Sequence, residues 1–211
     1  GLDNAGKSTQ IQLLLEELKK LGKKPVYLWT RAGYTAPFNA LKTLLRHIMG
    51  RKIPPPGRSE KRTRMIEKLW IRNLWLTIAL LDLVLVYGIY GRLLRLFGKA
   101  VIADRYLWDT WIDFGLNFPD VDINKWYLWK FLKWISPKPD ISFLLLIPVE
   151  ESLKRSKQKS EPFPDSGDVL RKRLTLYQEL SNSFNWYILD CMLPIEEIAK
   201  IIRKICKKAN N

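Results

Sequence analysis

The chain has 211 residues and a formal net charge of +15, because 36 lysines and arginines outnumber 21 aspartates and glutamates. With 47% hydrophobic residues it can bury a substantial core. The charge favours anionic partners, such as nucleotides, nucleic acid or an anionic membrane surface, without choosing among them. Cys191 and Cys206 lie too far apart for a close-spaced metal motif, and they are typical of reduced thiols in an intracellular protein.

The first nine residues, GLDNAGKST, fit the phosphate-loop pattern G-x-x-x-x-G-K-[ST]. In such a loop, glycines permit close phosphate approach, and backbone amides at the start of the next helix hold the anion. Lys7 would reach the terminal phosphates and Ser8 would bind Mg²⁺. The alternative is a glycine-capped helix start with a chance lysine. The predicted nucleotide-binding residues are Gly1, Asn4, Ala5, Gly6, Lys7, Ser8 and Thr9.

The chain then continues with helix, strand and helix patterns. Apolar residues at helical spacing predict a helix over residues 7–21, and PVYLWT predicts a short buried strand over residues 25–30. A second amphipathic helix is expected over residues 38–49. Residues 50–64 form a basic, proline-rich connection.

A long helical stretch is expected over residues 65–97, with a break near Gly88 and Gly91. Its middle part, residues 73–90, is almost entirely apolar and close to the lower length limit of a membrane span. Asp82 lies at the centre, where a charge costs about 3 kcal/mol in a bilayer. A buried helix of an α/β domain is therefore favoured over a membrane span, and association with a membrane surface stays open.

The second half of the chain alternates between strand and helix patterns. Apolar runs predict strands at residues 100–103, within 139–148, and at 186–190. Amphipathic patterns predict helices at residues 108–118, 123–134, 150–157, 169–183 and 195–207. This alternation predicts a single α/β domain over residues 1–211, with a mainly parallel sheet and helices on both faces.

A phosphate loop in such a fold normally follows a central strand of the sheet. Four strands are counted after the loop, and no strand precedes Gly1 in this sequence. We therefore expect that the first central strand is missing from this chain. An apolar run of about five to eight residues directly upstream would supply it.

Five segments, taken in order, resemble the thymidylate kinase family. They are GLDNAGKSTQ, TR after the second strand, DRY after the third, PDISFLLLI followed by a helix and a basic segment, and WYILD followed by PIEEIAKII. The resemblance spans nearly the whole chain. It implies a three-layer P-loop kinase fold with a small lid over residues 154–168. It also implies a cytoplasmic enzyme that transfers a phosphoryl group from ATP, with Mg²⁺, to a nucleoside monophosphate, with dTMP as the leading acceptor.

The resemblance also implies roles for single residues. Arg31 would bind the phosphate of the acceptor, and Asp3 would contact the acceptor sugar and the metal region. Asp104 would help to organise Mg²⁺ together with Ser8. These two residues are the predicted metal ligands. Arg105 would bind phosphate and offset charge on the transferred group.

The lid is expected to supply a further catalytic charge. Some family members carry a basic residue inside the phosphate loop, where this chain has Asn4. The candidates are Lys154, Arg155, Lys157 and Lys159, and the choice among them stays open. Arg155 is the best single choice because only arginine offers a planar fork. The predicted catalytic residues are Lys7, Asp104, Arg105 and Arg155.

The acceptor region departs from the family pattern. The helix before DRY lacks the usual base-reading arginine, and the segment after DRY, LWDTWIDFGLNF, is rich in aromatic residues. Asp109, Thr110 and Asp113 are candidate acceptor contacts there. Two alternatives stay open: a P-loop kinase for another phosphorylated metabolite, such as a sugar or lipid phosphate, and a non-catalytic protein that binds nucleotides or nucleic acid. A homodimer and peripheral membrane contact also remain open as partners.

Overall fold

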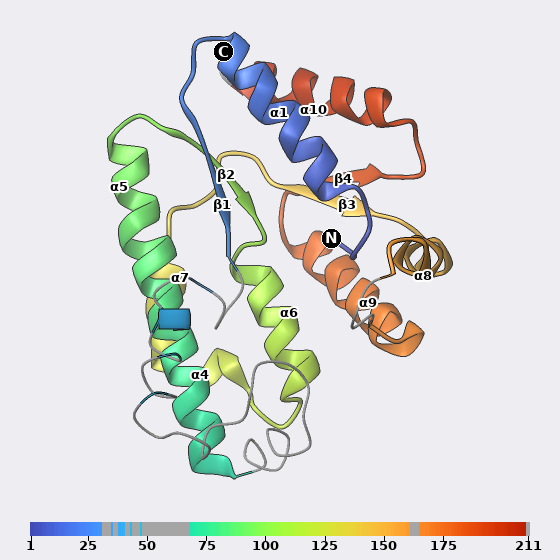
Figure 1. The fold of residues 1–211 in the computed structure, drawn as a ribbon. Coiled ribbons are helices and arrows are strands. Elements are labelled where there is room, and N and C mark those ends of the chain that lie inside the picture. Colours follow the sequence, from blue (N-terminus) through green and yellow to red (C-terminus); the bar gives the residue numbers. More distant parts are fainter. Residues whose placement is uncertain are drawn as a thin grey trace. The chain divides into compact units, whose positions relative to one another are not determined.

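The computed structural model describes residues 1–30, 35, 38–40, 43, 47, 68–160 and 165–209 (Figure 1). The chain divides into two compact units. Unit 1 comprises Gly1–Trp29, Gly98–Val121 and Lys138–Asn211, and unit 2 comprises Thr30–Phe97 and Asp122–Pro137. Most of the helix expected over residues 38–49 and all of the connection over 50–64 lie outside the described residues.

Unit 1 contains two pairs of parallel strands (Figure 1). Strand β1 (Pro25–Trp29) pairs with β2 (Ala100–Asp104), and β3 (Phe143–Leu146) pairs with β4 (Tyr187–Asp190). The parallel α/β character predicted from the sequence is confirmed. The described strands form two sheets of two strands each, where the sequence predicted one sheet.

The helices of unit 1 lie close to their predicted positions. They are α1 (Lys7–Lys20), α6 (Leu107–Asn117), α8 (Val149–Gln158), α9 (Gly167–Ser183) and α10 (Ile195–Ala209). Helix α1 packs against α10, whereas α6 and α8 both pack against α9. The Ser166 side chain accepts a hydrogen bond from the Val169 amide and so satisfies one donor at the start of α9.

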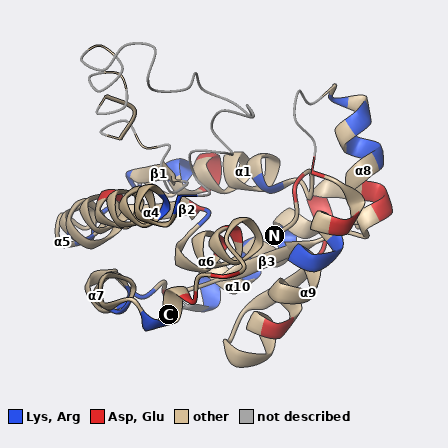
Figure 2. Cartoon of the chain, turned by 90° about the horizontal axis from the view of Figure 1, so that it is seen from below, with Lys and Arg blue, Asp and Glu red and all other residues tan. Residues whose placement is uncertain are grey.

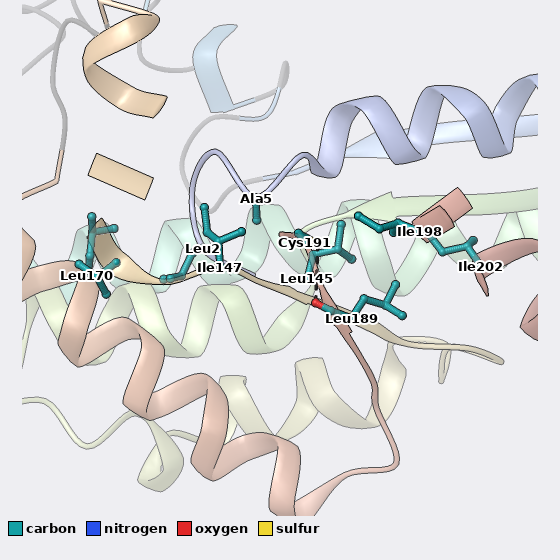
Figure 3. Close-up of a cluster of buried hydrophobic side chains, with 10 residues drawn as sticks. Leu2, Ala5, Leu145, Ile147, Leu170, Leu189, Cys191, Ile198 and Ile202 are labelled. Carbon is teal, nitrogen blue, oxygen red and sulfur yellow. Dashed lines mark hydrogen bonds between the residues drawn. The ribbon is translucent and has the colours of Figure 1, made fainter. Parts of the chain in front are cut away.

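An apolar cluster lies directly beneath the first residues of unit 1 (Figure 3). Leu2 and Ala5 are completely or almost completely buried. They pack with side chains on β3, β4, α8, α9 and α10 or directly after one of these strands, namely Leu145, Ile147, Val149, Leu170, Leu189, Cys191, Ile198 and Ile202. Burial of one large aliphatic side chain stabilises a fold by about 1.5–3 kcal/mol, so the N-terminal loop is fixed to the core of its own unit.

Unit 2 is built around one long helix. Helix α4 (Leu69–Leu83) continues through the π-helical segment η2 (Val84–Tyr90) into α5 (Gly91–Leu96). The predicted break near Gly88 and Gly91 is therefore wrong. A β-carbon added at Gly88 would lie 2.6 Å from the Ile135 side chain, so this glycine allows the close approach of helix α7 (Tyr127–Ile135).

The helix from Leu69 to Leu96 is long and apolar enough to span a membrane, by length and composition. Half of its most apolar 18-residue stretch is buried inside the structure. Asp82 is only 5% exposed, and its carboxylate accepts a hydrogen bond from the Thr35 hydroxyl. Burial of apolar side chains and an internal carboxylate that accepts a hydrogen bond are typical of a helix in the core of a globular domain.

Candidate active site

The N-terminal loop enters helix α1 through two residues with left-handed backbone angles. Gly6, which precedes the first helical residue, has φ of 79°, and Asn4 has φ of 60°. Because glycine adopts positive φ without steric cost, Gly6 lets the chain turn sharply into the helix. Ser8 and Thr9 then lie exposed in the first turn of α1. The loop and the exposed start of the helix thus form a continuous segment suited to binding an anion.

Lys7 is folded back onto this loop. Its Nζ donates to the Gly1 carbonyl at 3.2 Å and to the Leu2 carbonyl, and it lies 4.0 Å from the Asp3 carboxylate. Burial lowers the pKa of Lys7, and the positive charge of Arg105 lowers it further, while Asp3 opposes this effect. A bound polyphosphate would favour the charged form of this amine.

Arg105 connects the end of strand β2 with the loop. Its Nη2 donates to Asp3 Oδ1 at 2.8 Å, and its side chain is 11% exposed. Burial alone would lower the pKa of Arg105, but Asp109, Asp3 and Asp113 together raise it above its ordinary value. Arg105 also has φ of 71°, a conformation that costs a non-glycine residue roughly 1–3 kcal/mol and is typical of functional sites.

Asp104 ends strand β2 immediately before Arg105 and is 7% exposed. The Tyr27 hydroxyl donates to Asp104 Oδ2 at 3.0 Å. Burial, and then this hydrogen bond, raise the pKa of Tyr27 to about 12. Tyr27 was not predicted as a site residue. The signal that could have indicated it is its position in the strand. Tyr27 lies two residues before Trp29, which pairs with Asp104, and residues two apart on a strand lie on the same face of the sheet.

Helix α8 brings Arg155 to the loop. Ser152 Oγ donates to the Asp3 carbonyl at 2.8 Å, and Arg155 Nη1 donates to the Asn4 carbonyl at 3.2 Å. Arg155 Nε also donates to Glu151 Oε1, one turn earlier on the same helix, at 2.7 Å. Figure 2 shows the basic residues along α8 in blue. Lys154, Lys157 and Lys159 are exposed. Among the described basic residues of this segment, Arg155 is the one with a hydrogen bond to the loop.

Two carboxylates that the sequence offered as acceptor contacts have other partners. Asp109 accepts hydrogen bonds from the Tyr106 amide at 2.9 Å and from the Tyr177 hydroxyl at 2.5 Å. Asp113 accepts one from Arg173 Nη1 at 2.6 Å. Both carboxylates therefore bind side chains of helix α9, and their role as acceptor contacts stays a prediction.

Of the predicted site residues, only Arg31 lies outside the described residues. The structure brings Asp3, Asn4, Lys7, Arg105 and Arg155 together through the contacts given above. Within the described part of the chain, no three His, Cys, Asp or Glu side chains form a group that could hold a metal ion. This finding does not exclude Mg²⁺ bound mainly by phosphates and water, because Mg²⁺ commonly uses only one or two carboxylates.

Comparison with known proteins shows the family of the chain. The family model described as thymidylate kinase matches residues 89–202, which is more than half of the chain. The chain belongs to the thymidylate kinase family. The matched region of this thymidylate kinase family member includes Asp104, Arg105 and Arg155, whereas the phosphate loop precedes it.

Several curated proteins are similar to the chain. A probable thymidylate kinase of Methanocaldococcus jannaschii is 28% identical over 90% of this chain and 83% of its own length. A probable thymidylate kinase of Metallosphaera sedula is 33% identical over 48% of this chain and 50% of its own length. A probable thymidylate kinase of Sulfurisphaera tokodaii is 38% identical over 35% of this chain and 43% of its own length. The chain thus spans half or less of the length of the last two relatives.

Proposed function

We propose that the protein transfers the terminal phosphoryl group of ATP to dTMP and so forms dTDP. The observation that carries this proposal is the contact between Arg105 and Asp3 at 2.8 Å. It joins the end of a parallel strand to a loop with the phosphate-binding pattern. Membership of the thymidylate kinase family, and the names of its relatives, support the same reaction.

The loop and helix α8 would bind the donor. Backbone amides of Asn4, Ala5 and Gly6, and of the first turn of α1, would hold the phosphates. Lys7 would turn from the loop carbonyls to the terminal phosphates, which replace those carbonyls as its acceptors. Arg155 lies at the Asn4 carbonyl, so its remaining donors would reach the same region.

Mg²⁺ would be held by the Ser8 hydroxyl and by Asp104, acting directly or through water. A hydroxyl at the start of α1 and a carboxylate at the end of β2 are oxygen donors, which are the ligands that Mg²⁺ prefers. The ion would neutralise phosphate charge in the donor. Tyr27 restrains the same carboxylate through its hydrogen bond to Oδ2.

Phosphoryl transfer itself would need no covalent bond to the protein. An oxygen of the acceptor phosphate forms a bond to the terminal phosphorus of ATP, while the bond from that phosphorus to ADP breaks. Arg31 and Asp3 would orient the acceptor, and Arg105 would stabilise charge on the transferred group. The protein would therefore act by positioning and by electrostatic stabilisation.

A phosphoryl-transfer assay tests the proposal directly. The full-length gene product would be incubated with ATP, Mg²⁺ and dTMP, dUMP, UMP, CMP or GMP, and the diphosphates would be separated by chromatography. We expect turnover with dTMP at the highest kcat/KM, and its loss in Lys7→Met, which controls for a contaminating kinase. Absence of turnover on every monophosphate would reject the nucleotide proposal.

A different phosphorylated metabolite, such as a sugar or lipid phosphate, is the second candidate acceptor. The contacts of Asp109 with Tyr177 and of Asp113 with Arg173 favour it, because they occupy two polar side chains of the acceptor region. Preferred turnover of such a phosphate over dTMP would support this alternative. A non-catalytic role would instead show as ATP or nucleic-acid binding without transfer.

We also propose that the two units belong to one P-loop kinase domain whose sheet has a further, central strand upstream of Gly1. The two separate strand pairs of unit 1 support this proposal, because one strand placed between them would join them into a single sheet. The lid would comprise residues 154–168, of which 161–164 lie outside the described residues. An apolar segment encoded just before Gly1 is the expected finding, and a polar leader would contradict it.

A cytoplasmic homodimer is the assembly we propose. Helix residues Leu81, Leu85, Ile89 and Leu93 are each 44–51% exposed and follow one another at four-residue spacing. A second copy would present the same apolar stripe, as a two-fold interface requires. Light scattering should give the mass of a dimer, and Leu85→Glu should give a monomer. A monomeric wild type that binds anionic vesicles would favour peripheral membrane contact instead.

A further inference from the structure

Helices α6 and α9 are joined by two polar contacts in an otherwise apolar interface. Asp109 and Asp113 lie four residues apart on α6, and Tyr177 and Arg173 lie four residues apart on α9. Tyr177 donates to Asp109, and Arg173 donates to Asp113. Because residues four apart share one face of a helix, the two contacts form successive rungs between antiparallel helices.

The Arg173–Asp113 contact is buried, and the Tyr177–Asp109 contact is partly buried, because the Asp109 side chain is 17% exposed. Arg173 is 3% exposed, Asp113 is 6% exposed and Tyr177 is 1% exposed. The neighbouring side chains are apolar and include Ile112, Leu144 and Leu180. Burial alone would lower the pKa of Arg173, but Asp113 raises it above the ordinary value, so the guanidinium stays charged. Sliding one helix along the other would leave buried charges without partners, which disfavours any other register.

The rungs act on the start of α6, where Arg105 lies. Asp109 receives the Tyr177 hydroxyl with one oxygen and the Tyr106 amide with the other. Tyr106 directly follows Arg105, whose left-handed backbone must be held in place. The guanidinium of Arg105 in turn contacts Asp3 of the phosphate loop. The position of α6 along α9 thus sets where Arg105 lies relative to the loop.

We propose that Arg173 and Tyr177 are positioning residues that fix the register of α6 on α9 and thereby hold Arg105 over the phosphate loop. This inference rests on the phosphoryl transfer proposed above. Arg173 has an additional contact, because its Nη2 lies 3.5 Å from Asp165, just before α9 begins. Arg173 therefore also ties the start of α9 to α6.

Two variants of the full-length protein test the proposal. Tyr177→Phe removes the hydroxyl of one rung and keeps the ring. The double variant Arg173→Met with Asp113→Asn removes the other rung without leaving a buried carboxylate unpaired, so it is expected to fold. We expect kcat to fall about tenfold in each, with the KM for ATP within about twofold of wild type, because misplacement of a transition-state group affects kcat first.

A second readout does not depend on activity. Amide hydrogen exchange in residues 105–110 should become at least severalfold faster in both variants, because the anchor of the Tyr106 amide is loosened. Lys172→Met and Tyr187→Phe are matched controls, since Lys172 is an exposed cation beside Arg173 and Tyr187 is a half-exposed tyrosine on β4. Both controls should match wild type in kcat and in exchange.

The outcomes separate the two proposals. Folded variants with wild-type kcat and wild-type exchange would overturn the positioning role. A double variant with wild-type kcat but lowered stability would do the same, since Arg173 would then serve stability alone. If wild type transfers no phosphoryl group to any acceptor, the proposed function fails. In that case, wild-type hydrogen exchange at residues 105–110 in both variants would also overturn the proposal that Arg173 and Tyr177 fix the register of α6 on α9. Faster exchange in both variants would support it.

Discussion

Arg105 and Asp3 are 102 positions apart in the sequence, yet their side chains meet at 2.8 Å. The contact aligns a cation at the end of β2 with the loop that begins the chain. It also explains how an arginine can keep a left-handed backbone, because the side-chain contact offsets part of the conformational cost.

Arg105→Lys should lower kcat by about a hundredfold, because lysine keeps the charge but loses the planar fork that matches phosphate oxygens. Steady-state kinetics with ATP and dTMP measure this effect. Arg171→Lys is the matched control, since Arg171 is exposed and pairs with Asp168 one turn away. A variant at position 105 that keeps more than half of the wild-type kcat would rule out a role in transfer.

ATP binding should be coupled to proton uptake by Lys7. Burial and Arg105 lower the pKa of Lys7 below its ordinary value of 10.5, whereas bound phosphates favour the charged amine. Between the lowered pKa and 10.5 the unfolded state binds more protons, so the contribution of Lys7 to stability rises with pH there. Affinity for ATP should fall as pH rises through the same window.

Calorimetry in two buffers with different ionisation enthalpies measures this proton uptake. The apparent binding enthalpy at a pH between the lowered pKa of Lys7 and 10.5 should differ between the buffers for wild type. The difference should shrink in Lys7→Met, which cannot take up a proton at this position. Equal enthalpies for wild type in both buffers would show that Lys7 does not titrate on binding.

Tyr27→Phe should remove a stabilising contact whose pH dependence is defined. The pKa of Tyr27 is about 12 in the folded protein and ordinarily 10.0, so its contribution is complete below pH 10 and is lost as pH rises through 12. The loss in the variant at pH 7 should be about 1 kcal/mol or less, because the side chain is half-exposed. Urea unfolding at several pH values measures it, with Tyr187→Phe as the control. A difference that does not shrink above pH 10 would contradict the assignment.

Leu2→Ala should destabilise the protein and weaken ATP binding together. Leu2 is fully buried beneath the loop, and truncation of such a side chain typically costs about 2–5 kcal/mol. Leu21→Ala is the control, because Leu21 is 57% exposed and should change stability by about 0.5 kcal/mol at most. Thermal unfolding with and without ATP measures both effects. Wild-type ATP affinity in a destabilised Leu2 variant would show that the packing of Leu2 does not affect ATP binding by the loop.

Local sequence signals predicted most elements of unit 1. Helix α1 was expected over residues 7–21 and is found over Lys7–Lys20, and β1 ends at Trp29, one residue before its expected end. Both signals depend on neighbouring residues: helical spacing for α1 and a short apolar run for β1. The same information also placed Asp104 at the end of a strand.

Errors arose where the outcome depends on distant residues. Gly88 suggested a break, but it faces Ile135 of another helix, and the close approach of two helices leaves no trace in local sequence. The partners of Asp109 and Asp113, which are Tyr177 and Arg173 on another helix, could not be predicted for the same reason. Tyr27 was overlooked because its partner, Asp104, lies on the neighbouring strand. A single sequence shows which residues are polar, but not which helix or strand faces them.

Ser152 and Arg155 bind the carbonyls of Asp3 and Asn4, so α8 helps to fix the backbone path of the loop. The two segments are therefore a single module, even though about 150 residues separate them. In chimeras between relatives, a transplanted loop would lose its scaffold unless α8 came with it. Recombination designs for this protein should treat residues 1–9 and Val149–Gln158 as one exchangeable block.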